Sequence, residues 1–218
     1  MIEMIVALVV AYLLGSVNCA ILVCKYGKNG DPRAQGSKNP GATNVLRIAG
    51  KNAAIVTLLG DGLKGFFAVV IGHLLRLHGA ELALVGLAAF VGHLYPIYFK
   101  FQGGKGVATF LGVLFGLHLL LGVVAVVTWA VVAMVWRYSS LAALATAIIA
   151  PLYSLLFFHN GYFIPLLIAA ILLIYRHREN IARLRAGKES KINWKKEPAV
   201  KSVKKMAEHF HHDDQPKP

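Results

Sequence analysis

Long runs of uncharged, mostly apolar residues alternate along this chain with short polar stretches. The first run lies between Glu3 and Lys25 and contains 21 uncharged residues. At about 1.5 Å per helical residue, it is long enough to cross a hydrocarbon core of roughly 30 Å. No basic segment precedes this run and it lacks an Ala-x-Ala cleavage pattern. We therefore expect a membrane-spanning helix rather than a cleaved signal peptide.

The next two runs predict two more membrane helices. One begins at Asn52, which can cap it, and continues to about Leu75, and the other covers Leu82–Phe99. The earlier helix carries Asp61 and Lys64 near its middle, a depth at which charges are costly. Because residues spaced in this way are neighbours on a helix, we expect the two side chains to pair with each other. A direct role in function is the alternative.

The last two runs are too long for one comfortable crossing each. Gly106–Trp136 contains 31 uncharged residues and Tyr138–Tyr175 contains 38. The longer run predicts two helices joined near His159-Asn160-Gly161, because about 20 residues suffice for one span. The shorter run predicts two short helices hinged within residues 116–122, which gives seven spans in all. A single helix in the shorter run gives six, and single helices in both give five.

The distribution of Lys and Arg favours seven spans. Twelve of the 23 basic residues follow Tyr175, and six more lie in Lys25–Lys51. Both segments are expected in the cytoplasm, because cytoplasmic loops carry an excess of Lys and Arg. Six spans would place the basic C-terminal segment outside, and five would leave 38 residues as one helix.

We therefore predict an all-α, polytopic integral membrane protein with seven transmembrane helices. Its N-terminus is expected outside and its C-terminus in the cytoplasm. Residues 1–192 would form the membrane domain. Residues 193–218 would form a basic, flexible cytoplasmic tail.

Composition narrows the possible classes of protein. With 57% hydrophobic residues, 15% charged residues and a mean hydropathy of +0.60, the chain is not a soluble globular domain. The net charge of +13 comes mainly from segments beside the membrane helices, so nucleic acid is not an expected partner. Cys19 and Cys24 indicate neither a disulfide framework nor a zinc site. The acidic residues form no cluster typical of a divalent-metal site, so no metal is expected.

The first polar motif covers residues 36–47 and has the composition of an anion-binding segment. Its glycines expose backbone N–H groups, and Asn39-Pro40 can open a short helix whose N-terminus attracts negative charge. A phosphate is the natural ligand, whereas a solvated connector between two helices is the alternative. The candidate ligands are Gly36, Ser37, Asn39, Gly41, Thr43, Asn44 and Arg47.

The second polar motif is Gln102-Gly103-Gly104-Lys105-Gly106. It is not a P-loop, because a glycine follows Lys105 where that motif needs Ser or Thr. A lysine that opens a helix between glycines can nevertheless hold a phosphate or an oxyanion with its charge and the free N–H groups. A flexible turn with one snorkelling lysine is the alternative.

The third polar motif is Arg176-His177-Arg178-Glu179-Asn180-Ile181-Ala182-Arg183. Helical spacing would place Arg176, Asn180 and Arg183 on one face, with His177 beside them. His177 can act as a general base or as a neutral hydrogen-bond donor, whereas an asparagine can only orient or polarise. Arg178 and Arg185 are better explained as lipid anchors.

Together the three motifs resemble a known set. They are similar to the motifs of the bacterial membrane acyl-phosphate:glycerol-3-phosphate acyltransferase family, without departure from its pattern. The resemblance extends to about Ile192 and includes Asp61-x-x-Lys64-Gly65. It rests on Gly36-Ser37-x-Asn39-Pro40-Gly41-Ala42-Thr43-Asn44-Val45-x-Arg47, Gly103-Gly104-Lys105-Gly106-Val107-Ala108-Thr109 and His177-Arg178-x-Asn180-Ile181-x-Arg183-Leu184.

This resemblance implies a multi-pass enzyme of the bacterial inner membrane with its active site facing the cytoplasm. The enzyme would move a fatty acyl group from acyl phosphate to the sn-1 hydroxyl of glycerol 3-phosphate. The products would be lysophosphatidic acid and phosphate, in the first acylation of phospholipid synthesis. The resemblance implies no cofactor, and we expect a monomer surrounded by membrane lipids.

The resemblance also implies roles for individual residues. Ser37, Lys105, His177 and Asn180 would be catalytic. Lys105 and its glycines would neutralise charge on a leaving phosphate, and His177 and Asn180 would orient the attacking hydroxyl. The hydroxyl proton would pass to His177 or to the departing phosphate. The substrate-binding residues would be Gly36, Asn39, Gly41, Thr43, Asn44, Arg47, Gly103, Gly104, Gly106 and Arg183.

Two other classes of protein remain as alternatives. A small transporter for phosphate esters could use glycine loops and the charges of Asp61 and Lys64, although the chain shows no inverted repeat. A noncatalytic scaffold could bind anionic lipids through the basic tail. Deletion of the residues after Trp194 separates the scaffold from the enzyme, because only the scaffold depends on the tail.

Overall fold

The described part of the protein, residues 1–158 and 161–192 of the computed structural model, is entirely helical. No strand occurs within these residues, which confirms the all-α class. The predicted tail at 193–218 and residues 159–160 of the predicted junction lie outside the described residues. The elements are α1 Ile2–Ser16, α2 Cys19–Tyr26, α3 Ala42–Ile48, α4 Lys51–Leu74, α5 Gly79–Leu94, η1 Ile97–Phe99, α6 Val107–Leu117, α7 Leu119–Trp136, α8 Ser139–Phe157, α9 Phe163–Arg176 and α10 Arg178–Arg185.

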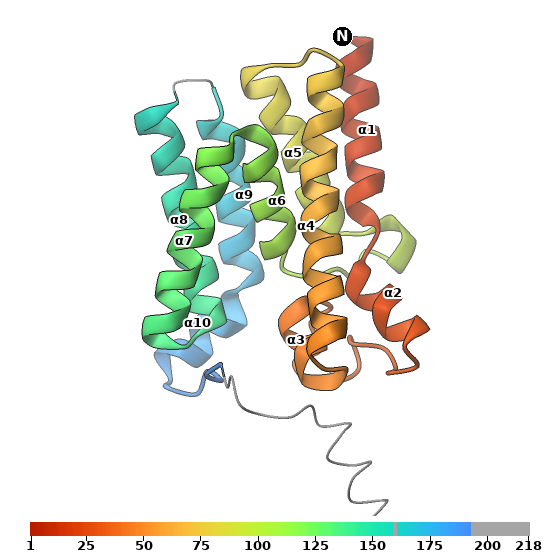
Figure 1. Cartoon of the computed structure of the whole chain (residues 1–218), viewed down its shortest axis with the longest axis vertical. Helices are drawn as coiled ribbons and strands as arrows, with labels where there is room; N and C mark the ends of the chain where they lie inside the picture. The colour runs from red at the N-terminus through yellow and green to blue at the C-terminus, as the bar shows by residue number, and fades with distance from the viewer. Residues whose placement is uncertain (159–160, 193–218) are drawn as a thin grey trace, which may run out of the picture.

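The long helices form one bundle (Figure 1). Within the described residues, five helical segments are long and apolar enough to cross a membrane, and α6 and α9 are shorter apolar helices. In the bundle α1 packs along α5, α4 along α6, and α7 along α8. Large apolar side chains such as Leu59, Phe67 and Val131 point outward, as expected for a surface in contact with lipid. The five segments are Ile2–Tyr26, Lys51–Leu74, Gly79–Phe99, Leu119–Trp136 and Ser139–Phe157.

The first apolar run is a broken helix rather than the single helix that its length predicts. The backbone leaves the helix at Val17, and the side chain of Asn18 caps α2 by accepting from the N–H of Ile21 at 3.1 Å. The break leaves backbone groups without helical partners. Two side chains of α4 bind them: Lys64 Nζ donates to the carbonyl of Val17 at 2.5 Å, and Asp61 accepts from the N–H of Cys19 at 3.2 Å.

The predicted pairing of Asp61 with Lys64 is confirmed. Lys64 Nζ lies 2.9 Å from Asp61 Oδ1, and both side chains are almost completely buried. The same ammonium lies 2.9 Å from Nδ1 of His93 on α5. The pair therefore joins α4 to α5 and to the break between α1 and α2.

Both long C-terminal runs divide into two helices, as their lengths predict. The shorter run breaks at His118, whose Nδ1 accepts from the N–H of Leu120 at 3.2 Å and so caps α7. The longer run breaks between Phe157 and Phe163.

Three predicted boundaries are wrong. Asn52 does not cap α4, because the helix begins at Lys51 and Gly50 is its N-cap. The third helix begins at Gly79 rather than Leu82, and it ends at Leu94 rather than Phe99, because Pro96 follows and proline stops a helix. These corrections change only the ends of the predicted helices.

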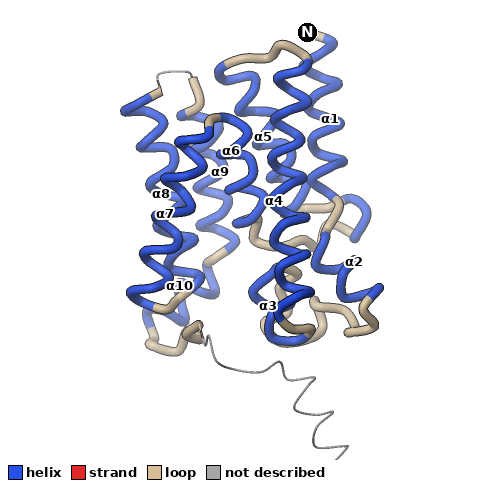
Figure 2. Tube along the Cα trace, viewed as in Figure 1, coloured by secondary structure: helices blue, strands red, loops and turns tan. Residues whose placement is uncertain are grey.

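The helices α3 and α10 lie at the end of the bundle opposite to the N-terminus (Figure 1). The loops before α3 and before α6 reach the same half of the molecule, where Figure 2 shows most of the non-helical chain. All three polar motifs lie in or beside these segments. The fold therefore gathers the three motifs toward the end of the bundle opposite to the N-terminus.

Candidate active site

The first motif forms a loop that leads into α3. Gly41 is the N-cap of α3, so the helix starts just after the predicted Asn39-Pro40. The buried side chain of Asn44 holds the preceding loop: its Oδ1 accepts from the N–H of Ser37 at 2.9 Å. Its Nδ2 donates to the carbonyls of Pro32 at 2.9 Å and Gln35 at 3.0 Å. Asn44 therefore shapes the loop that presents Ser37.

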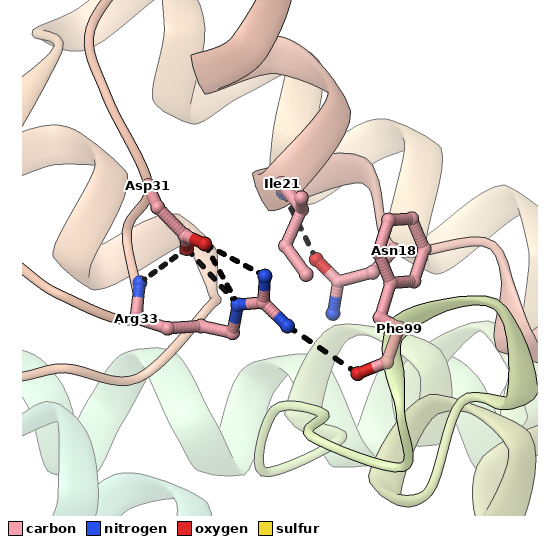
Figure 3. A network of polar contacts seen from close by, with 5 residues as sticks. All are labelled: Asn18, Ile21, Asp31, Arg33 and Phe99. Atoms are coloured by element: carbon pink, nitrogen blue, oxygen red, sulfur yellow. Dashed lines mark hydrogen bonds and ion pairs between the residues drawn. The ribbon is translucent and has the colours of Figure 1, made fainter.

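Arg33 anchors this loop to η1 (Figure 3). Its guanidinium donates to both carboxylate oxygens of Asp31 at 2.7–3.0 Å and to the carbonyl of Phe99 at 3.3 Å. The hydrogen bond from Arg33 lowers the pKa of Asp31, so this link stays ionised at neutral pH.

The glycines of the second motif are buried between α5, α9 and the first motif. The N–H of Gly104 donates to the carbonyl of His93 at 3.2 Å. Arg176 donates from Nη2 to the carbonyl of Gly103 at 2.8 Å and from Nε to that of Gly104 at 3.2 Å. A Cβ on Gly104 would lie 2.3 Å from His93 Nε2 and 2.8 Å from the carbonyl oxygen of Pro40. Only glycine fits this close contact between the two motifs.

Lys105 directly precedes the N-cap of α6 and points toward the third motif. Its Nζ donates a hydrogen bond to Oδ1 of Asn180. Burial and the nearby charge of Arg183 lower the pKa of Lys105 to about 8. The ammonium therefore sits at a helix N-terminus in a partly desolvated, cationic setting, which favours binding of an anion.

The third motif does not form the single helix that its spacing predicts. α9 ends at Arg176, His177 forms the junction, and α10 starts at Arg178. Arg176 at the end of α9 and Asn180 in α10 nevertheless both contact the second motif.

His177 is buried, and its Nδ1 lies 2.8 Å from the carbonyl oxygen of Leu173. A carbonyl only accepts, so Nδ1 carries the proton and Nε2 carries the lone pair. Burial lowers the pKa of His177 to about 4. This imidazole is therefore neutral at pH 7 and a weak base.

Glu189 belongs to the site, although the sequence reasoning did not single it out. Its Oε1 accepts from Asn180 Nδ2 at 2.6 Å and from Ser140 Oγ at 2.7 Å, and its Oε2 accepts from Arg183 Nε at 2.6 Å. Burial opposes ionisation, but the hydrogen bonds from Asn180, Ser140 and Arg183 lower the pKa of Glu189. The one available signal was a lone acidic residue within a strongly basic segment.

These contacts connect all three motifs. Thr43 Oγ1 of the first motif lies 3.4 Å from Ser139 Oγ, next to Ser140, which bonds Glu189. Glu189 bonds Asn180, Asn180 bonds Lys105, and the adjacent Gly104 lies against Pro40 of the first motif.

Several candidate side chains remain available at this site. Within the described residues, the side chains of Ser37, Asn39 and Arg47 make no hydrogen bond, and Ser37 and Arg47 are exposed. In the same part of the chain, no group of three or more His, Cys, Asp or Glu side chains could hold a metal ion. The arrangement is a cationic site of amides, a partly buried lysine and arginines beside a buried glycine loop, which suits a ligand with phosphate groups.

Comparison with known proteins agrees with this chemistry. The family model described as "Glycerol-3-phosphate acyltransferase" matches residues 5–187. A curated glycerol-3-phosphate acyltransferase of Coxiella burnetii is 50% identical over 188 residues, which are 86% of this chain and 97% of the relative. One of Burkholderia multivorans is 49% identical over 201 residues, 91% of this chain and 95% of the relative.

Two crystal structures of PlsY (YgiH), an integral membrane glycerol 3-phosphate acyltransferase, have a similar fold. The glycerol 3-phosphate form is 37% identical with a TM-score of 0.83, and the match covers 87% of this chain and 96% of that chain. The lysophosphatidic acid form is 36% identical with a TM-score of 0.80, with coverage of 87% and 95%.

Proposed function

Because the chain belongs to the glycerol-3-phosphate acyltransferase family, we propose that it transfers a fatty acyl group to the sn-1 hydroxyl of glycerol 3-phosphate. The product is lysophosphatidic acid. The observation that carries the proposal is the contact of Lys105 with Asn180, which joins the second and third motifs across 75 positions of sequence. An anion-binding lysine thereby lies beside an amide that can orient a hydroxyl.

The acyl donor in this proposal is acyl phosphate. The glycerol oxygen attacks the acyl carbonyl carbon, the bond from that carbon to the phosphate oxygen breaks, and inorganic phosphate leaves. An acyl phosphate is already activated, so neither a protein nucleophile nor a metal is needed. Lys105 and the N–H groups of Gly103 and Gly106 bind the donor phosphate and neutralise the charge that grows as it leaves, while Gly104, whose N–H donates to the carbonyl of His93, holds the loop in place.

The first motif holds the phosphate of glycerol 3-phosphate in this scheme. Within the described residues, the exposed side chains of Ser37 and Arg47 make no hydrogen bond and can donate, whereas the N–H of Gly41 already donates to the carbonyl of Asn39 at 3.0 Å. Asn44 acts through the shape of the loop, since both hydrogens of its amide are bonded to protein carbonyls. Arg183 contributes positive charge from α10. The residues assigned to this phosphate are Gly36, Ser37, Asn39, Gly41, Thr43 and Arg47.

His177 through Nε2 and Asn180 through its second amide hydrogen orient the attacking hydroxyl, since the other contacts of the Asn180 amide go to Lys105 and Glu189. With a pKa of about 4, His177 is a poor acceptor for the hydroxyl proton. The departing phosphate, whose second pKa is near 6 to 7, is the better acceptor. We therefore assign proton removal to the substrate and hydrogen bonding to the protein.

Seven spans with an outside N-terminus best explain the arrangement. Five long apolar segments and the two shorter helices α6 and α9 supply the crossings. The three motifs then lie on the cytoplasmic face of a bacterial inner membrane. Glycerol 3-phosphate reaches them from the cytoplasm, and the acyl chain of the donor stays in the bilayer. One chain holds all proposed groups, so a monomer suffices. A C-terminal fusion to a fluorescent protein that matures only in the cytoplasm tests this topology, because an outside C-terminus leaves it dark.

The deciding experiment mixes purified protein in detergent with glycerol 3-phosphate and palmitoyl phosphate in EDTA, with palmitoyl-CoA as a parallel donor. Lysophosphatidate and inorganic phosphate from palmitoyl phosphate alone are the expected result. Product from palmitoyl-CoA alone would contradict the donor assignment. No product with either donor, together with uptake of glycerol 3-phosphate into proteoliposomes, would favour a transporter.

A further inference from the structure

A buried polar cluster lies directly behind the glycine loop of the second motif. It consists of Asp61 and Lys64 of α4 and His93 of α5, which are 2%, 5% and 3% exposed. Lys64 Nζ lies 2.9 Å from both Asp61 Oδ1 and His93 Nδ1. None of the three has a role in the transfer described above. Because burying charges is costly, such a cluster needs an explanation.

One side of the cluster holds the break between α1 and α2. Lys64 donates to the carbonyl of Val17 at 2.5 Å, and Asp61 accepts from the N–H of Cys19 at 3.2 Å. Both charged side chains of α4 therefore bind backbone groups that the break leaves without helical partners.

The other side of the cluster is the ring of His93, which faces Gly104. The lysine ammonium only donates, so Nδ1 of His93 accepts and the neutral ring carries its proton on Nε2. That Nε2 edge lies against the Cα of Gly104, since a Cβ there would approach it to 2.3 Å. The carbonyl of His93 also accepts from the N–H of Gly104 at 3.2 Å. His93 thus touches the glycine loop with both its backbone and its ring.

We infer that Asp61, Lys64 and His93 form a positioning device that sets the placement of the glycine loop and, through it, of Lys105. The α1–α2 break anchors Lys64, Lys64 orients the His93 ring, and the ring and the carbonyl of His93 hold Gly104. Lys105 follows in the chain. Asp61, Lys64 and His93 are positioning residues, because they act on the reaction through Lys105. The inference rests on the proposed function only in the tests that measure turnover.

The first test compares His93→Ala with His93→Gln. Alanine removes the ring, and the amide N–H of glutamine can reach the place of Nε2. We expect His93→Ala to lower kcat with palmitoyl phosphate by about tenfold to a hundredfold, as expected for small misplacements of a catalytic group. The KM for glycerol 3-phosphate should change by less than about twofold, because another motif binds it. His93→Gln should recover part of kcat. Normal kcat per folded His93→Ala protein would overturn the inference.

A second variant covers the case in which single substitutions unfold the protein. The double variant Asp61→Leu/Lys64→Met removes both charges together and keeps similar volume, a change that buried ion pairs often tolerate. It should fold, as judged by thermal unfolding in detergent, and still lose kcat about tenfold or more. A folded double variant with normal kcat would contradict the inference. His118→Gln, at the distant α6–α7 junction, is the matched histidine control and should keep kcat.

A third readout does not depend on the proposed reaction. Modification of Lys105 by an amine-reactive reagent, followed by peptide mass spectrometry across pH, reports its pKa, which is about 8 in the native site. In His93→Ala the midpoint should move toward the ordinary value of 10.5, because a displaced lysine regains water. An unmoved midpoint would count against the positioning device even if the wild-type protein showed no acyltransfer. An inactive wild type with a shifted midpoint would instead refute only the proposed function.

Discussion

Lys105 is the residue on which the proposed chemistry depends most. It lies at a helix N-terminus, donates to Asn180 and has arginines nearby, and within residues 1–158 and 161–192 it forms no salt bridge, so it can bind a phosphate. We expect Lys105→Ala to lose about 2–4 kcal/mol of transition-state stabilisation, the range for loss of a key donor to developing charge. Steady-state kinetics should show this loss in kcat. A change confined to KM would contradict the assignment, and Lys100→Asn is the control, an exposed lysine of the same loop.

The lowered pKa of Lys105 predicts that kcat decreases on the alkaline side of its pH profile. Its ammonium is charged below its pKa of about 8 and neutral above it. Phosphate binding and charge neutralisation need the charged form, so kcat should fall as the pH rises through about 8. Lys105→Arg should move this decrease to higher pH, because guanidinium stays protonated. No acid limb near 6.5 is expected from His177, whose pKa is about 4.

At the scale of elements, Glu189 joins α10 to the start of α8. It fixes the amide of Asn180 so that Oδ1 faces Lys105. Glu189→Ala should therefore lower kcat by about tenfold to a hundredfold, since a hydrogen bond to a charged group contributes about 1.5–3 kcal/mol. Glu189→Gln, which keeps an acceptor, should lose less. Equal activity of Glu189→Ala and the exposed control Glu179→Gln would refute this role.

Close packing of α4 against α6 sets the position of the helix that carries Lys105 at its start. A Cβ on Gly112 would lie 1.9 Å from the carbonyl oxygen of Gly62. Gly112→Val should therefore destabilise the fold by about 1–3 kcal/mol through overpacking. Thermal unfolding in detergent measures the change. Val131→Leu, on the outer surface, is the control and should leave the unfolding temperature within a degree or two.

At the scale of the whole molecule, the bundle carries the proposed site on one end, and every group assigned to the site lies within residues 36–189. We expect a chain ending at Trp194 to retain most of the wild-type kcat in detergent. Loss of all function on this truncation would favour the lipid-binding scaffold. Proteoliposomes with and without anionic lipid give a second comparison: turnover independent of lipid charge is expected for the enzyme, whereas a scaffold that binds anionic lipid through its tail should depend on it.

Much of this architecture followed from the sequence alone. The lengths of the apolar runs, compared with the thickness of a bilayer, located the long helices and showed that the run from Tyr138 to Tyr175 holds two. This was possible because the length of an apolar run can be read from a short stretch of sequence. Helix ends were less predictable. The break at Val17 depends on side chains of α4 that bind the freed backbone groups, and no local pattern reports such partners.

By itself, the sequence determined the helical class, the apolar segments and the residue types of the three motifs, since each depends on composition within a short window. Only the tertiary structure decided which of these residues meet. The bonds from Lys105 to Asn180 and from Arg176 to Gly103 join positions 75 and 73 residues apart. It also brought Glu189 into the site, directed the side chain of Asn44 to the loop before α3, and placed His93 against Gly104. Such contacts depend on how packed helices bring distant segments together, and spacing along one chain carries no record of that.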